Sequence, residues 1–169
     1  FCVFPLISAI LQVLFVGSPM ISAGVTFASL QVYVSSREQL ISVDPLTKLN
    51  NRTEMVRFLD NKMKNRNPNK ELYLFIMDVD YFKKINDKFG HIEGDIAITI
   101  VADALKKSVR KTSLFVCRYG GDEFVVVGEV KPDFNPDEFC ELVNKNLEEE
   151  TKIRGKDYIL RMSIGYFKY

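Results

Sequence analysis

Two adjacent carboxylates, Asp122 and Glu123, follow a glycine pair at the predicted tip of a β-hairpin. Apolar runs flank this segment on both sides, as expected of two strands, and Gly120 and Gly121 would supply the positive φ angles that a tight turn needs. Glycine also lets a ligand approach the backbone closely. Such a tip could bind a metal ion, although a Gly-Gly-Asp-Glu turn by itself is more often only a polar hairpin tip.

A second acidic pair ends an apolar stretch further upstream. Residues 72–77 are continuously apolar, as in a buried strand, and the chain then turns polar at Asp78 and Asp80. Hard divalent cations such as Mg²⁺ take oxygen ligands, usually one or two protein carboxylates together with substrate phosphates. Asp78 and Asp122 could supply that pair if their strands are neighbours. An EF-hand loop is excluded, because its fifth and glycine positions would hold an aromatic and a basic residue.

Four segments taken together resemble the GGDEF domain of diguanylate cyclases. In order along the chain, they are Asp44–Arg52, Asp78–Asp95, Arg118–Phe124 and Ser163–Gly165. The resemblance runs from Asp44 to the end of the chain. It implies an enzyme that condenses two molecules of GTP into cyclic di-GMP and releases two pyrophosphates, with Mg²⁺ or Mn²⁺ as its cofactor.

The resemblance also implies roles for individual acidic residues. Asp78 and Asp122 would ligate the metal through their carboxylates, with the backbone carbonyl of Val79 as a further ligand. Glu123 would contribute to a second metal or deprotonate the attacking ribose hydroxyl, and the identity of the base stays open between Asp122 and Glu123. Metal ions suit this reaction, because they neutralise phosphate charge and activate the nucleophile.

Phosphate binding is assigned to the turn that follows residues 72–78. The resemblance implies that the backbone N–H groups of Tyr81 and Phe82 and the ammonium group of Lys83 hold the phosphates, with Lys83 counted among the catalytic residues; helix N-termini and lysines attract anions. The resemblance also implies that Gly120 and Gly121 lie beside the bound nucleotide.

Base recognition falls on a different set of residues. Guanine offers N1–H and an exocyclic amine as donors and O6 as an acceptor, so a carboxylate beside an amide can read it. Asn86 and Asp95 occupy the matching family positions, with His91 close by. Taken alone, Asn86 and Asp95 would more often be helix caps. An aspartate rather than a serine at position 95 indicates GTP and not ATP.

Two departures from the family pattern bear on regulation and completeness. Members with product inhibition carry an Arg-x-x-Asp motif, and the corresponding residues here are Lys111 and Leu114, so we expect no such inhibitory site. The family continues beyond Ser163–Gly165 through another helix and strand with a phosphate-contacting basic residue. We therefore expect a C-terminally truncated domain over 44–169 that binds GTP but turns it over slowly.

The elements that must position these residues follow from the apolar pattern. The predicted helices are 35–43 (a linker), 52–65, 82–88, 94–111 and 135–153, and the predicted strands are 72–78, the two arms of the hairpin and 158–167. This order predicts an α+β domain of ferredoxin-like topology, βααββαβ, similar to the palm arrangement of the family's nucleotidyl cyclases.

The N-terminal part has a different composition. Residues 1–36 contain no charged side chain, and all 23 basic and 22 acidic residues follow them. Apolar runs at 1–16 and 20–34 flank a Gly-Ser-Pro turn, each slightly short of the roughly 20 residues that span a bilayer. We interpret 1–34 as transmembrane helices at the end of a larger membrane sensor; a signal peptide and a buried helical hairpin are the alternatives. The basic residues that follow predict a multi-pass cell-membrane protein with a cytoplasmic GGDEF domain.

The remaining features set limits on function. The net charge of +1 gives no sign of a nucleic-acid partner. Cys2, Cys117 and Cys140 have no metal-ligand spacing, which indicates reduced thiols. Because the reaction needs a GTP on each of two facing domains, the resemblance implies a homodimer formed through the membrane and linker helices. The alternative function is a GGDEF domain without catalysis that acts as a GTP-binding or protein-binding regulatory module.

Overall fold

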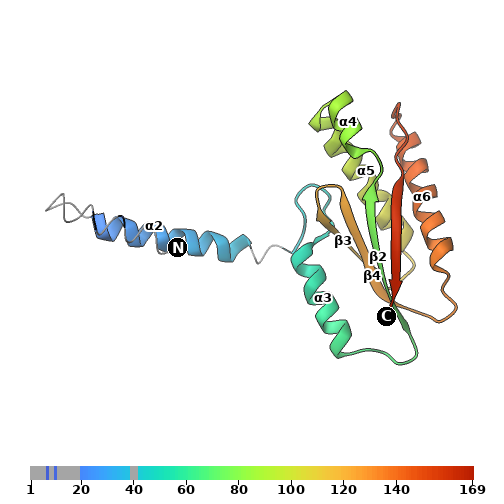
Figure 1. Cartoon of the computed structure of the whole chain (residues 1–169), viewed down its shortest axis with the longest axis horizontal. Helices are drawn as coiled ribbons and strands as arrows, with labels where there is room; N and C mark the ends of the chain where they lie inside the picture. Colours follow the sequence, from blue (N-terminus) through green and yellow to red (C-terminus); the bar gives the residue numbers. More distant parts are fainter. Residues whose placement is uncertain (1–6, 8–9, 11–19, 39–41) are drawn as a thin grey trace. The chain divides into compact units, whose positions relative to one another are not determined.

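The computed structural model describes residues 7, 10, 20–38 and 42–169, and the chain divides into two units, 1–41 and 42–169. In the first unit, the helix α2 spans Met20–Glu38 (Figure 1). None of the helices in the described part of the chain combines the length and the apolar character needed to cross a membrane. The predicted transmembrane helices thus find no support there, and most of the first apolar run lies outside the described residues.

The predicted linker helix at 35–43 is wrong at its end. The helix α2 includes residues 35–38, and residues 39–41 lie outside the described part. Ser42 and Val43 are not helical, and Val43 forms an isolated antiparallel bridge with Asn50.

The second unit is built on a five-stranded sheet in the order β1-β3-β4-β2-β5. Its strands are β1 (Asn50–Asn51), β2 (Glu71–Val79), β3 (Phe115–Gly120), β4 (Glu123–Val130) and β5 (Met162–Lys168). Neighbouring strands are antiparallel, except that β1 runs parallel to β3. Because β2 lies between β4 and β5, the strand that carries Asp78 is held on both sides.

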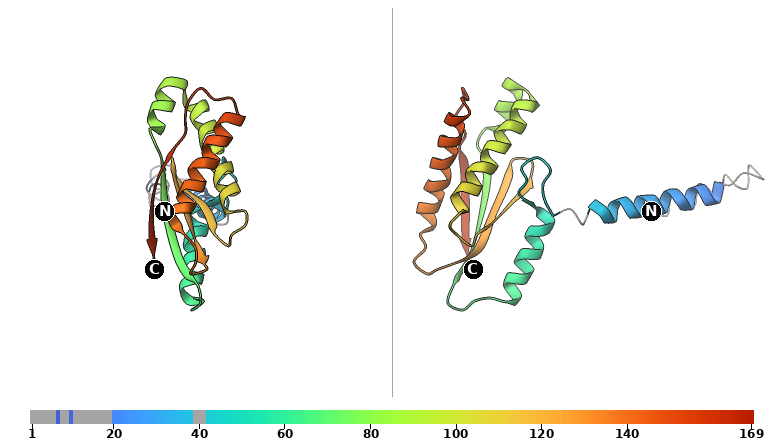
Figure 2. Two further views of the ribbon diagram at one scale, coloured as in Figure 1. Left: turned by 90° about the vertical axis from the view of Figure 1, so that its right-hand side faces the viewer. Right: turned by 180° about the vertical axis from the view of Figure 1, so that it is seen from behind.

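Four helices accompany the sheet, and each lies close to its predicted position. They are α3 (Arg52–Lys64), α4 (Phe82–Phe89), α5 (His91–Val109) and α6 (Pro136–Ile153). The right-hand view of Figure 2 shows α5 and α6 side by side in front of the sheet. The order β2-α4-α5-β3-β4-α6-β5 confirms the predicted βααββαβ topology.

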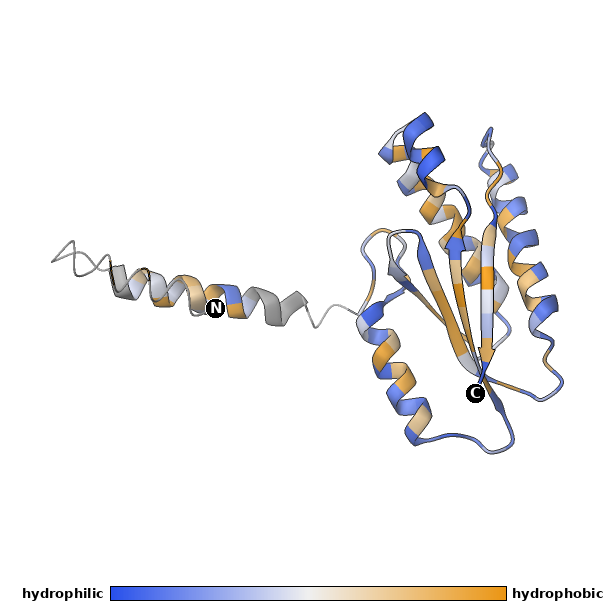
Figure 3. Ribbon diagram, in the orientation of Figure 1, coloured by the Kyte–Doolittle hydropathy of each residue, from blue (hydrophilic) through white to orange (hydrophobic). Residues whose placement is uncertain are grey.

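Alternation along β2 determines which side chains form the core. Phe75 and Met77 are fully buried in the cluster beneath α5 and α6, and each contributes roughly 2 kcal/mol of hydrophobic stabilisation. Leu72 faces the opposite way, into a smaller cluster with Met55 of α3. Figure 3 shows the resulting apolar strands between polar helix surfaces. The exposed side chain of Asp78 continues the alternation at the end of this well-packed strand.

Candidate nucleotide-binding site

Strand register brings the predicted metal ligands to one end of the sheet. Asp78 lies opposite Glu123 on β4 and opposite Ser163 on β5. The backbone N–H of Val79 donates to the carbonyl of Asp122 over 3.3 Å. Asp78 and Asp122 therefore come from neighbouring segments linked by a backbone hydrogen bond, which meets the condition that the sequence left open.

Negative charge accumulates at this end of the sheet. Desolvation raises the pKa of Asp78 above its ordinary value, and the charges of Asp122, Glu123 and Asp80 raise it further. Like charges disfavour the ionised form of a carboxyl group, because each carboxylate repels the next. A bound divalent cation would remove that repulsion.

The oxygen donors at this site could supply part of the coordination shell of Mg²⁺. No three His, Cys, Asp or Glu side chains of the described residues are grouped closely enough to hold a metal by themselves. The predicted set has three carboxylates, those of Asp78, Asp122 and Glu123, together with the backbone carbonyl of Val79, and these three carboxylates do not by themselves form a closed metal site. Mg²⁺ usually keeps one or two protein carboxylates and completes its coordination with water and substrate phosphates. The oxygen donors are thus of the right kind for a cation that arrives with a nucleotide.

Arg118 fixes the tip of the β3–β4 hairpin. Its Nε and Nη2 donate to the carbonyl of Gly121 over 3.0 and 2.8 Å. Gly121 has a positive φ of 50°, as predicted. The same prediction is wrong for Gly120, which is the last residue of β3 and does not have a positive φ. Only Gly121 of the pair adopts the left-handed region, and the ladder shifts register between Arg118 and Gly120.

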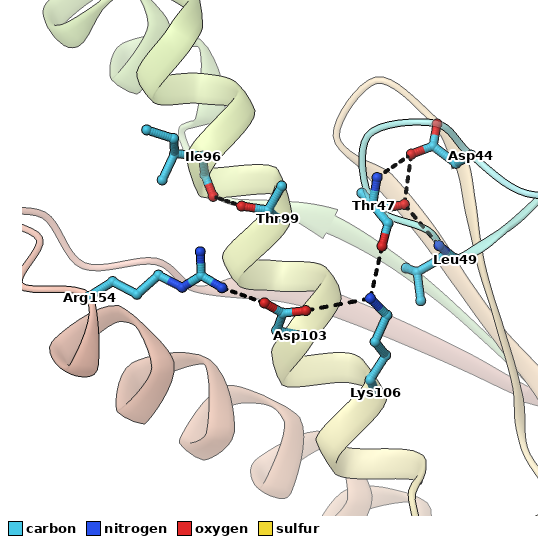
Figure 4. Close-up of polar contacts among 8 residues, drawn as sticks. All are labelled: Asp44, Thr47, Leu49, Ile96, Thr99, Asp103, Lys106 and Arg154. Atoms are coloured by element: carbon cyan, nitrogen blue, oxygen red, sulfur yellow. Dashed lines mark hydrogen bonds and ion pairs between the residues drawn. The ribbon is translucent and has the colours of Figure 1, made fainter.

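Arg118 also joins the hairpin to the loop where the domain begins. Its Nη1 lies 3.2 Å from Oδ1 of Asp44. The backbone N–H and hydroxyl of Thr47 donate to the same oxygen over 2.8 and 2.7 Å, and Lys106 of α5 donates to the carbonyl of Thr47 over 2.8 Å (Figure 4). The sequence showed Asp44 and Arg118 as parts of separate motifs, and only their opposite charges hinted at the pairing.

The charge on Asp44 is stabilised in the folded protein. Partial burial raises the pKa of this carboxyl, but the hydrogen bonds from Thr47 and the guanidinium of Arg118 outweigh burial and hold the pKa below its ordinary value. Asp44 therefore stays ionised and keeps its partner Arg118 directed at the hairpin.

The turn after β2 carries the predicted phosphate-binding groups. Tyr81 precedes α4 as its N-cap, with a left-handed φ of 57° and no capping hydrogen bond from its side chain. This conformation is strained by roughly 1–3 kcal/mol for a residue other than glycine. The first N–H groups of α4 have no side-chain cap, and the exposed Lys83 lies in the same turn of helix. These groups can bind an anion where β2 ends.

The predicted guanine-binding residues lie at the bend between α4 and α5, which we call the elbow (residues 86–95). Asn86 is in α4, His91 is the first residue of α5, and Gly90 joins the two helices with φ 86°. A Cβ at Gly94 would lie 1.9 Å from Oδ1 of Asn86, so the amide of Asn86 packs directly on the residue before Asp95. Because Asn86 and Asp95 both lie inside helices, the alternative reading as helix caps is wrong.

The site residues thus form two groups. The metal group, Asp78, Val79, Asp122 and Glu123, is at the sheet end, and the guanine group, Asn86, His91 and Asp95, is at the elbow. Residues 80–85 connect Val79 of the metal group to Asn86 of the guanine group along the chain. Figure 1 shows β2 leading directly into α4, so the two groups lie at the same end of the domain.

Comparison with protein families agrees with this geometry. Residues 41–169 match the model of the diguanylate cyclase GGDEF domain. The chain belongs to the GGDEF family. This confirms the resemblance inferred from the four motifs, and the boundary differs by only a few residues from the predicted start at Asp44.

The known relatives of this GGDEF domain include a protein named as a diguanylate cyclase and one named as a cyclic di-GMP phosphodiesterase. It is 38% identical over 96 residues to diguanylate cyclase DgcP of Pseudomonas aeruginosa, covering 56% of this chain and 14% of that protein. It is 31% identical over 136 residues to the cyclic di-GMP phosphodiesterase NbdA of the same species, and this match covers 80% of this chain and 17% of NbdA. The chain therefore spans only a small part of either relative.

A solved structure supports the GGDEF fold independently. The coiled coil and GGDEF domain of DgcB from Caulobacter crescentus, in complex with c-di-GMP, superimposes with a TM-score of 0.60. The match covers 88% of this chain and 80% of the chain in that structure at 22% sequence identity. At that identity the similarity shows the fold.

Proposed function

We propose that this chain is the catalytic domain of a diguanylate cyclase, a nucleotidyltransferase that condenses two GTP into cyclic di-GMP and releases two pyrophosphates. The observation that carries the proposal is the strand register, which sets Asp78 directly opposite Glu123 at an intact Asp122–Glu123 tip. Desolvation raises the pKa of Asp78, and the charges of this carboxylate cluster raise it further, as is common at functional sites.

The metal group has two tasks in this proposal. Asp78, Asp122 and the carbonyl of Val79 hold Mg²⁺ or Mn²⁺, and Glu123 assists. When bound there, the cation would supply charge neutralisation at the phosphates and would lower the pKa of the ribose 3′-hydroxyl that attacks the α-phosphate. Asp122 or Glu123 accepts the proton of that hydroxyl, since both carboxylates lie at the tip. Arg118 acts on neither substrate nor metal but keeps the tip in place through the carbonyl of Gly121.

The turn and the elbow bind the rest of GTP. The N–H groups of Tyr81 and Phe82 and the ammonium of Lys83 hold the phosphates, and the hairpin glycines Gly120 and Gly121 lie beside the nucleotide. The carboxylate of Asp95 accepts from guanine N1–H and the exocyclic amine, while the amide of Asn86 and the exposed His91 complete base recognition.

The active form in this proposal is a homodimer, because each product molecule joins two GTP that are bound on two facing domains. We further propose that the domain is cytoplasmic, where GTP is found, and that the protein is membrane-anchored. Membrane anchoring rests on the uncharged residues 1–36 alone.

A regulatory module that binds GTP without turning it over is the second candidate. The similarity to NbdA favours it, because that relative is named a phosphodiesterase and not a cyclase. The two candidates share the guanine group and differ in whether the metal group is used for catalysis.

The deciding experiment incubates the whole protein with Mg²⁺ and radiolabelled GTP and separates the nucleotides by chromatography. Asp122→Ala removes the hairpin carboxylate. Asp133→Ala, an exposed aspartate beyond the far end of β4, is the matched control. We expect cyclic di-GMP from the parent and from Asp133→Ala, and none from Asp122→Ala. Bound GTP without product would favour the regulatory module, and a parent that binds no GTP would contradict both candidates.

A further inference from the structure

The elbow has little hydrophobic anchorage of its own. Ile85 is the only buried residue of α4. Gly90 ends α4 and precedes α5, and no side chain caps either helix there. The bend is held by backbone hydrogen bonds, since the N–H of Gly90 donates to the carbonyl of Asn86 over 2.8 Å and the N–H of Gly94 donates to the carbonyl of Gly90 over 3.1 Å. Figure 3 shows that the surface of α4 is largely polar. Since binding of a base requires Asn86, His91 and Asp95 at fixed separations, other contacts must restrain this segment.

Two residues from the segment between α6 and β5 supply such contacts. The hydroxyl of Tyr158 donates to Oε1 of Glu93 over 2.7 Å. Nζ of Lys156 lies 2.6 Å from the same oxygen. The ring of Tyr158 also packs on Phe89, with centroids 5.5 Å apart. Glu93 and Phe89 lie on opposite sides of Gly90, so Lys156 and Tyr158, which we call the brace, contact both arms of the elbow.

The polar part of the brace is partly shielded from water. The side chains of Lys156 and Glu93 are 20% and 21% exposed, so their interaction is less screened than that of a fully exposed surface pair. Hydrogen bonds from Lys156 and Tyr158 hold the pKa of Glu93 below its ordinary value. Burial raises the pKa of Tyr158, and so does the hydrogen bond to Glu93. The carboxylate therefore stays charged and the phenol stays a donor around neutral pH.

We propose that Lys156 and Tyr158 are positioning residues for guanine recognition: through Glu93 and Phe89 they hold the elbow so that Asn86, His91 and Asp95 face one base. The inference rests on the proposed function, because the ligand of the elbow is GTP. None of the brace residues belongs to the segments that carry the metal group, so the brace affects GTP binding and not the chemical step.

The test compares two Tyr→Phe variants of the full chain. Tyr158→Phe removes the hydroxyl and keeps the ring against Phe89. Tyr166→Phe is the matched control, because its hydroxyl donates to another carboxylate, Oδ1 of Asp137, over 2.8 Å. We expect Tyr158→Phe to raise the dissociation constant and KM for GTP roughly threefold to tenfold, as for loss of a typical hydrogen bond, because Lys156 still pairs with Glu93. We also expect kcat to be unchanged and amide exchange at residues 86–95 to become faster.

Several results would overturn the inference. Parent-like GTP affinity in Tyr158→Phe would do so, even if amide exchange at the elbow increased. An equal loss of affinity in Tyr166→Phe, or a loss that appears in kcat instead of KM, would also do so. Glu93→Gln keeps the size of the side chain and removes its charge, and it must weaken GTP binding as well. A parent chain that binds no GTP would contradict the proposed function, and this inference would fail with it.

Discussion

The sheet end and the elbow position their residues by different means. At the sheet end, Asp78 and Glu123 are placed by the backbone ladder between β2 and β4, and the side chains themselves point away from the core. At the elbow, Asn86 and Asp95 depend on side-chain contacts: Asn86 packs on Gly94, and Tyr158 reaches Glu93 from a distant segment. Substitutions at the sheet end should therefore change chemistry without changing the fold, whereas substitutions at the elbow should change affinity in proportion to the displacement.

The largest effect is expected for Asp78→Ala and Asp122→Ala. Each removes a proposed metal ligand, so turnover should fall by roughly a thousandfold or more. The melting temperature should stay close to that of the parent, because the carboxylates add mutual repulsion and no core contact. Turnover assays beside thermal unfolding followed by circular dichroism check both parts. Unfolding of either variant at the assay temperature would show that the sheet end also carries stability.

The next largest effect is expected for Gly94→Ala at the elbow. The new methyl group would lie 1.9 Å from Oδ1 of Asn86, so the amide must move. Weaker hydrogen bonding to the base should raise the dissociation constant of GTP by roughly tenfold or more. Gly165→Ala is the matched control, because a Cβ there meets no atom within 4 Å. Isothermal titration calorimetry of both variants with GTP measures the two dissociation constants. Parent-like affinity in Gly94→Ala would contradict the placement of Asn86.

The difference between the regions also explains how much the sequence could predict. β2 and the hairpin were predictable, because their apolar runs are continuous and Asp78 and Asp122 mark their ends. The elbow was less predictable. The sequence predicted that α5 starts at Gly94, because a glycine is typical of a helix boundary, but α5 begins at His91 and Gly94 lies within it, against Asn86.

Short and non-local features escaped prediction for related reasons. The strand β1 has only two residues, too few for any alternation to appear. The last strand begins at Met162 and not at position 158, because Tyr158 turns toward Glu93 instead of continuing the ladder. No local pattern encodes such a contact, since its two residues are far apart in sequence. The assignment of roles to individual site residues stays a prediction.

A smaller effect, on stability, is expected for Asp44→Asn. This variant tests whether the loop where the domain begins, which contains Asp44 and Thr47, helps to hold the sheet end in place. The pKa of Asp44 is lowered in the folded protein, so the unfolded chain binds this proton more tightly. The contribution of the Asp44–Arg118 pair is therefore fully present above the ordinary value of 3.8 and is lost as pH falls through the lowered folded pKa. We expect Asp44→Asn to lower the free energy of unfolding by about 1–2 kcal/mol at neutral pH.

Urea unfolding of the parent and Asp44→Asn at a series of pH values checks this. The difference between the two proteins should shrink toward zero in acid below the folded pKa of Asp44. A difference that is constant with pH would mean that the charge of Asp44 does not contribute to stability. If Asp44→Asn lowered turnover as well as stability, the loop that contains Asp44 would support the function of the hairpin as well as its structure.

The smallest effect is expected for Ser163→Ala. The hydroxyl of Ser163 donates to Oδ1 of Asp80 over 2.6 Å, the side-chain bond that spans from β5 to the turn after β2. The backbone N–H of Asp80 already donates to the carbonyl of Arg161 over 2.9 Å, so the turn has a main-chain support that the substitution leaves intact. If the register between β2 and β4 is sufficient to position the metal group, Ser163→Ala should change kcat and KM by less than about threefold. A tenfold loss in kcat would mean that the sheet end depends on a side-chain contact as the elbow does, and the contrast between the two regions would then be one of degree.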